Sequence, residues 1–178
     1  AALAACLIYM NSSNPFGTGR VVYKHDENGI KEIRITSQKG RITFARENGR
    51  WTMTEPASHA ADEELVASLG KRLAHLEADR VVDENAQDLS LYGLDAPAAE
   101  IDFSLDGGKE KTLLVGSMTA SKSRYYIMDS GDRRVCTAGA DVIGPFLAPA
   151  ADFKDRSLLA ASPGSISSLS LDKGVKRE

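Results

Sequence analysis

Cysteine is scarce in this sequence and basic residues are not in excess, and both shortages narrow the range of functions. The 178 residues include only two cysteines, Cys6 and Cys136, whose separation and different surroundings indicate one tail cysteine and one core thiol. They form neither a disulfide framework nor a zinc-ligand spacing. The formal net charge is −3, so the composition gives no electrostatic signal for nucleic acid, whose binding needs a face that neutralises several phosphates. We therefore expect no nucleic-acid partner.

Motifs for catalysis and ligand binding are lacking as well. Residues 116–123 match a phosphate-binding P-loop except that Ser121 replaces its second glycine, and the residues that follow read as a strand instead of the required helix. No Gly-x-Ser-x-Gly elbow is present, and the acidic stretch 79–88 lacks the glycine and ligand spacing of an EF-hand loop. The three histidines share no metal-ligand spacing: His25, His59 and His75. The sequence predicts no catalytic residue, cofactor or metal site, and an enzyme without a recognisable motif is the alternative.

The first ten residues, Ala1–Met10, contain no charge and no turn-forming residue. A membrane-spanning helix needs about 20 apolar residues, so we interpret this segment as the end of a truncated transmembrane or signal anchor. The alternatives are a lipoprotein signal with Cys6 as the lipid-bearing residue and a buried N-terminal helix of the domain itself. Residues 11–28 begin with a polar stretch and are predicted to form a linker. We expect the domain that follows to face the periplasm or the cell exterior.

Apolar and polar residues alternate through most of the body, which predicts half-buried antiparallel strands. A first meander has turns at 37–40 and 47–50, where Asn-Gly favours a tight hairpin, and its apolar positions are Ile33, Ile35, Ile42, Phe44, Trp51 and Met53. A second set of strands is expected at 101–105, 112–115, 125–128 and 133–137. Two sheet segments are therefore expected to flank one helix.

That amphipathic helix is predicted to run from an N-cap at Asp62 to about Glu77. Its apolar stripe consists of Leu65, Val66, Leu69, Leu73 and Leu76. Short helical segments are expected at 88–93, 141–147 and 151–159. The predicted fold class is α+β, with antiparallel meanders packed on the helix.

We assign the α+β domain to residues 29–160 and the start of a second, truncated unit of the same kind to residues 161–178. The apolar residues of Ile166–Glu178 fall at places that match those of Ile30–Ile42, with a turn two residues shorter. Such self-similarity is typical of tandem repeats.

Short segments spread over about Gly29–Leu159 carry a family resemblance. The most specific are Tyr92-Gly93-Leu94-Asp95 before Pro97, and Leu113-Leu114-Val115-Gly116; further matches are 49–53, Pro56, the Asp62 helix, Asp88-Leu89, Tyr125-Tyr126 and 155–159. In combination the chain resembles the bacterial domain of unknown function 4340 family (DUF4340). The resemblance implies a membrane-anchored protein facing away from the cytoplasm, often with tandem copies of the domain and beside ABC transporter components of the gliding-motility auxiliary type. It supplies no catalytic residues.

Three aromatic residues are the predicted contacts for a ligand or partner. Trp51, the only tryptophan, is suited to be a platform for a glycan or peptide, although its place in a half-buried strand favours the core. Tyr125 and Tyr126 are consecutive in a strand and point to opposite faces, so one ring is expected to be exposed. We expect a non-catalytic, membrane-anchored interaction module that is accessory to an ABC transporter or envelope complex. A polysaccharide- or peptide-binding domain is the alternative.

Overall fold

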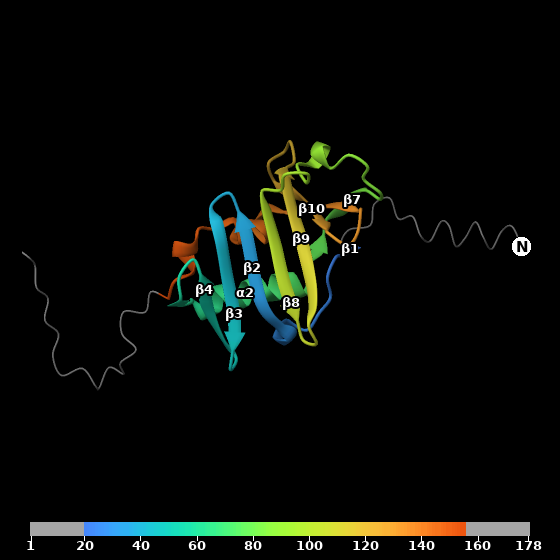
Figure 1. Ribbon diagram of the computed structural model, residues 1–178. Coiled ribbons are helices and arrows are strands. Elements are labelled where there is room, and N and C mark those ends of the chain that lie inside the picture. The colour runs from blue at the N-terminus through green and yellow to red at the C-terminus, as the bar shows by residue number, and fades with distance from the viewer. Residues whose placement is uncertain (1–19, 156–178) are drawn as a thin grey trace, which may run out of the picture.

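Nine antiparallel strands form one continuous sheet in the computed structural model, which describes residues 20–155 (Figure 1). Their order across the sheet is β5 (His59–Ala60), β4 (Arg50–Glu55), β3 (Gly40–Glu47), β2 (Ile30–Ser37), β8 (Ala99–Leu105), β9 (Lys109–Met118), β10 (Arg124–Asp129), β11 (Val135–Gly139) and β7 (Arg80–Asp83). The α+β class is confirmed, but the expected two separate sheet segments are not. They are joined because β2 pairs with β8 as well as with β3, so that Ile33 lies opposite Phe103 and Ile35 opposite Ile101.

The first three long strands form the predicted meander. At the β3–β4 turn, Asn48 and Gly49 both have positive φ, 52° and 82°. Two successive positive φ angles give a hairpin turn whose twist matches that of the strands, and Asn-Gly adopts them at little cost. The predicted hairpin is therefore confirmed at its turn as well as at its strands.

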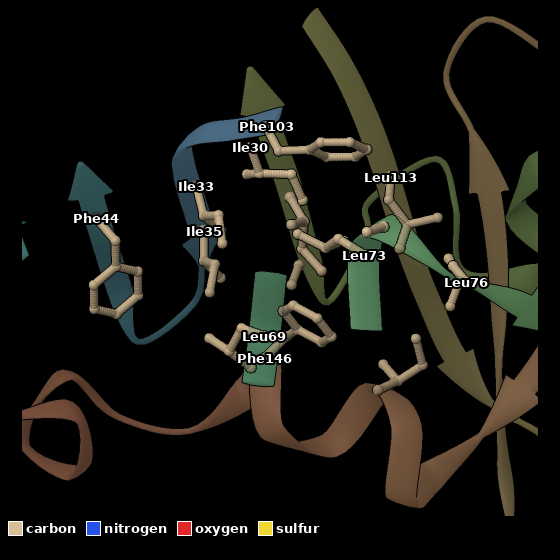
Figure 2. Packing of buried hydrophobic residues seen from close by; sticks show 14 of the residues in the cluster. Ile30, Ile33, Ile35, Phe44, Leu69, Leu73, Leu76, Phe103, Leu113 and Phe146 are labelled. Carbon is tan, nitrogen blue, oxygen red and sulfur yellow. The ribbon is translucent and has the colours of Figure 1, made fainter. Parts of the chain in front are cut away.

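Helix α2 (Glu63–Ala74) lies across the inner face of the sheet, and the Asp62 carboxylate accepts a hydrogen bond from the Leu65 amide as its N-cap. Figure 2 shows Leu69 and Leu73 of the helix opposite Ile33, Ile35 and Phe103 of the strands, with Phe146 closing the cluster. Buried apolar area of this kind supplies most of the stability of a domain, at about 25 cal/mol per Å².

Two details of the predicted helix are wrong. Leu65 is 45% exposed, because it lies one position, or about 100°, away from the buried Val66 on the helix surface. The helix ends at Ala74 instead of about Glu77, since the chain turns at His75 to form β6 (Glu77–Ala78). Leu76 is buried as expected, but from extended chain.

The predicted linker over 11–28 is corrected from residue 20 onward. Strand β1 (Arg20–Val21) pairs with β6 in a separate two-stranded sheet, and the Leu76 carbonyl accepts hydrogen bonds from the next two amides of the chain. Tyr23 is 3% exposed and meets the Phe103 ring edge-on, with 5.1 Å between the two ring centroids. A 3₁₀ turn, η1 (Glu27–Gly29), then leads into β2. Three consecutive apolar residues, 21–23, among polar ones are a weak sequence signal, which is why this segment reads as a linker.

The C-terminal part of the described chain closes the inner face with short helical turns. These are α3 (Ala140–Ile143), η3 (Gly144–Leu147) and η4 (Ala150–Phe153). Phe146 is 1% exposed and Phe153 packs edge-on against Phe44 at 5.2 Å. Short closing helices are thus present, while residues 156–159 of the predicted last one lie outside the described part of the chain.

The outer face of β9, β10 and β11 is covered by the connection between β7 and β8, which contains the turn η2 (Leu89–Tyr92). This turn confirms the helical segment expected at 88–93: the structure shows Asp88 as its N-cap, and Gly93 ends it with φ 65°. Between this connection and the strands lies a second apolar cluster, which consists of Ala86, Leu94, Met128 and Val135.

The predicted anchor, 1–10, and the predicted second unit, 161–178, lie outside the described residues. Between residues 20 and 155, no helix is long and apolar enough to cross a membrane.

Candidate functional site

A pocket of about 320 Å³ lies where β1 crosses the ends of β9, β10 and β11, and we call it the β1 pocket. Its wall includes Val21 and Ile127, and Cys136 also lines it. Five ionisable side chains come to it from four separate segments: Arg20, Lys111, Asp129, Asp132 and Arg134. The sequence predicted none of these as a site, because Arg20 and Lys111 are far along the chain from residues 129–134.

Lys111 occupies an inward position of β9, opposite Phe103 of β8. Its ammonium lies 3.2 Å from the Asp129 carboxylate and 5.9 Å from the centroid of the Tyr23 ring. An opposite charge and an aromatic face both stabilise a cation. One sequence signal could have identified Lys111 as a site residue. It occupies the same face of β9 as the buried Leu113 and Val115, where an apolar residue is expected.

Arg134 and Arg20 form the other cationic side of the β1 pocket. Arg134 pairs with Asp132 and lies 3.9 Å from Glu84, and Arg20 lies 3.4 Å from the same glutamate. The Arg134 guanidinium lowers the pKa of Asp132, and Asp132 in turn raises the pKa of Arg134. The charges of this side are therefore held ionised and mutually compensated.

The two neutral titratable groups beside these charges are held protonated. Burial raises the pKa of the Cys136 thiol, and the cations Arg134 and Arg20 offset this effect only in part. Burial, followed by the Asp129 carboxylate, raises the pKa of Tyr23 far above its ordinary value. A thiol is nucleophilic only as thiolate, so burial keeps the Cys136 thiol from being activated as a nucleophile.

Trp51 belongs to the core, where the sequence favoured placing it. Its side chain is 4% exposed, and its backbone amide donates to the Glu63 carboxylate at 2.9 Å. The ring also borders a second pocket of about 410 Å³ between α2 and strands β3 and β4, and the Arg46 guanidinium carbon lies 5.7 Å from the ring centroid.

Tyr125 and Tyr126 point to opposite faces of β10, as predicted, but neither is an exposed ring. Tyr125 packs against the main core, and Tyr126 meets Tyr92 edge-on at 5.2 Å in the outer cluster. The expectation of an exposed ring fails because the connection between β7 and β8 covers the outer face. Four strands separate β10 from the β4 strand that carries Trp51, so the three predicted contact residues do not form one site.

The P-loop-like segment does not have P-loop geometry. Strand β9 ends at Met118, and β10 begins at Arg124 after a short turn, so no helix follows the lysine of the motif. Within residues 20–155, no group of three or more His, Cys, Asp or Glu side chains is arranged to hold a metal ion.

Two of the segments that carry the family resemblance lie against each other. Gly116 of β9 packs under Tyr92, and the Ser117 hydroxyl donates to the Tyr92 carbonyl at 3.0 Å. The class defined by these features is an α+β domain in which a glycine-dependent loop covers the outer face of strands β9–β11. A family model described as domain of unknown function (DUF4340) matches residues 51–178, and the chain belongs to this family. No curated protein and no solved structure matches it.

Proposed function

We propose that this chain is a non-catalytic interaction module, anchored in a membrane by Ala1–Met10 and accessory to an ABC transporter or envelope complex. The observation that carries the proposal is the β1 pocket, whose ionised groups are paired while Cys136 is kept protonated. General acid–base or nucleophilic catalysis needs a group with a pKa near the working pH. Paired charges around a pocket suit recognition of a partner instead.

The position of the β1 pocket along the chain supports a partner in the membrane. Arg20 at its rim follows Met10 by ten residues, which extend over at most about 35 Å. A lipid attached at Cys6 would allow a longer reach, at most about 50 Å over fourteen residues. The proposal includes a periplasmic or extracellular location and a second unit beginning at 161–178, so that tandem domains present several surfaces to one complex.

Cysteine substitutions at two exposed apolar positions test the proposal. Val21 is 53% exposed at the rim of the β1 pocket, and Leu91 is 71% exposed on the outer loop. In intact cells, a membrane-impermeant photoactivatable maleimide should label both Val21→Cys and Leu91→Cys in the full-length protein. On illumination only Val21→Cys should crosslink to a membrane component, identified by mass spectrometry as a transporter or envelope subunit.

The wild-type protein is the baseline in this experiment. Its buried Cys136 should react only after denaturation. Any labelling of the native wild-type protein therefore comes from Cys6 and is subtracted from that of the variants. If both variants are labelled only after the cells are lysed, the extracytoplasmic location is contradicted. Equal crosslinking from both positions, or none, would contradict a partner at the β1 pocket.

A polysaccharide- or peptide-binding domain is the second candidate, favoured by the pocket beside Trp51. Because Trp51 is the only tryptophan, its fluorescence reports directly on this pocket. Soluble muropeptides, which contain both sugar and peptide, should change its emission in a saturable way, and Arg46→Gln should weaken the effect. An unchanged spectrum at millimolar muropeptide would remove this candidate.

A further inference from the structure

A separate pocket of about 300 Å³ lies between β7, β11 and the turn that joins β9 to β10, and we call it the hydroxyl pocket. It shares no residue with the β1 pocket. Its lining consists of Asp79, Arg80, Thr119, Ser121, Arg124 and Thr137. Two of these residues belong to the P-loop-like segment that the fold leaves without a helix.

Two arginines give this pocket an excess of positive charge. The Arg80 guanidinium makes no hydrogen bond or ion pair with any residue between 20 and 155. Arg124 donates from Nε to the Asp79 carboxylate at 2.7 Å, which leaves its two terminal nitrogens available. With one carboxylate against two guanidinium groups, the lining carries a net charge of +1.

Hydroxyl groups line the opposite side of the hydroxyl pocket. Thr119 and Ser121 are linked through their side-chain oxygens at 3.1 Å, and Ser121 continues to Ser123 at 2.8 Å. The turn that carries them is fixed by backbone hydrogen bonds from the Thr119 amide to Arg124 and from the Lys122 amide to Thr119. A hydroxyl hydrogen rotates freely, so these groups can redirect a donor toward a ligand.

Thr137 supplies an independent observation that points to a ligand in this pocket. It is fully buried, pairs with Arg80 across β11 and β7, and its hydroxyl oxygen has no hydrogen-bond partner among the described residues. A buried hydroxyl without a partner destabilises a fold, so native proteins rarely leave one unsatisfied. Thr137 lines the same pocket as the two arginines, so a ligand oxygen that enters there would give this hydroxyl a partner.

We propose that the hydroxyl pocket binds a phosphate group carried by a small phosphate ester or a lipid headgroup. Arginine forks pair with phosphate oxygens in bidentate geometry, and a tetrahedral phosphate has enough acceptors for two guanidinium groups and three hydroxyls together. A carboxylate, with two oxygens, would leave several of these donors unused. This inference goes beyond the proposed function and does not depend on the anchor or on the β1 pocket.

Isothermal titration calorimetry with inorganic phosphate tests the site in the full chain, at constant ionic strength with chloride as the control anion. Arg80→Gln should weaken phosphate binding at least tenfold, because it removes the unpaired cation. Arg41→Gln, at an exposed position of β3 outside the pocket, should leave it unchanged. Equal loss in both variants would show only a general charge effect and would overturn the proposal.

Thr137→Val separates a ligand-binding hydroxyl from a structural one. It should weaken phosphate binding several-fold and raise the melting temperature of the phosphate-free protein, because an unsatisfied polar group is removed from the interior. A lowered melting temperature would show that the hydroxyl supports the fold, which contradicts its role here.

Vesicle flotation distinguishes the two sources of phosphate. Phosphatidylcholine vesicles with and without phosphatidic acid are compared, so that any binding through the apolar N-terminal segment is common to both. If phosphatidic acid increases the fraction of protein bound to vesicles and Arg80→Gln abolishes the increase, the pocket binds a lipid headgroup. If calorimetry shows phosphate binding but phosphatidic acid gives no such increase, the pocket binds a soluble phosphate ester. Absence of both responses would overturn the proposal.

Discussion

Phe103→Ala should lower the free energy of unfolding by about 3–5 kcal/mol, the range found when a buried phenylalanine is truncated. Phe103 is 2% exposed and lies opposite Ile33 of β2 and Lys111 of β9. It therefore sits at the junction where the two halves of the sheet meet. Urea denaturation of the full chain, followed by circular dichroism, measures the change. The loss is a large part of the 5–15 kcal/mol that stabilises an ordinary domain.

The same substitution should also release the N-terminal segment, because the Tyr23 ring rests on Phe103 at 5.1 Å. Trypsin should then cut after Lys24 faster than in the wild type at the same urea concentration. Phe103→Leu, which keeps most of the volume, should cost under about 1.5 kcal/mol. Leu91→Ala on the exposed outer loop should change stability by less than about 0.5 kcal/mol. A loss below 1 kcal/mol in Phe103→Ala would show that the sheet does not depend on this junction.

Features governed by neighbouring residues could be predicted from the sequence. The Asn48-Gly49 turn, the Asp62 cap and the Gly93 stop each depend on the conformational preference of one or two residues. Alternation likewise identified the long strands, because it reports which face of a strand is buried. The α+β class follows from these local signals alone.

Features that depend on distant pairing could not be predicted. The continuity of the sheet comes from the pairing of β2 with β8, whose partners Ile33 and Phe103 are seventy residues apart. The β1 pocket is assembled in the same way. Its charges meet only because the fold places Arg20 beside the ends of β9–β11, which are distant from it in the sequence. The covering of Tyr126 by Tyr92 also needs the path of a loop that no periodic pattern specifies. In each case the missing information is which segments lie side by side.

The contact between the outer loop and β9 requires a glycine at position 116. A Cβ atom there would lie 2.2 Å from the Tyr92 carbonyl oxygen and 3.0 Å from Cγ of Leu94. The first distance is far inside van der Waals contact, and the atom it meets belongs to the backbone, so a side-chain rotation cannot relieve it. Either β9 or the loop must move. Because Leu94 belongs to the outer apolar cluster, a shift of the loop would also open that cluster.

We expect Gly116→Ala to destabilise the domain by about 3 kcal/mol, at the upper end of the usual cost of overpacking. Gly144→Ala is the matched control, since Gly144 has helical backbone angles and nothing within 4 Å of an added Cβ. It should be neutral or stabilise by up to about 1 kcal/mol, because alanine restricts the unfolded chain. Urea denaturation compares the two variants, and hydrogen exchange should show the loss of protection in Gly116→Ala centred on residues 84–98. Equal stability of the two variants would mean that the loop does not pack on β9 as the structure describes, and that the two most specific segments of the family do not meet.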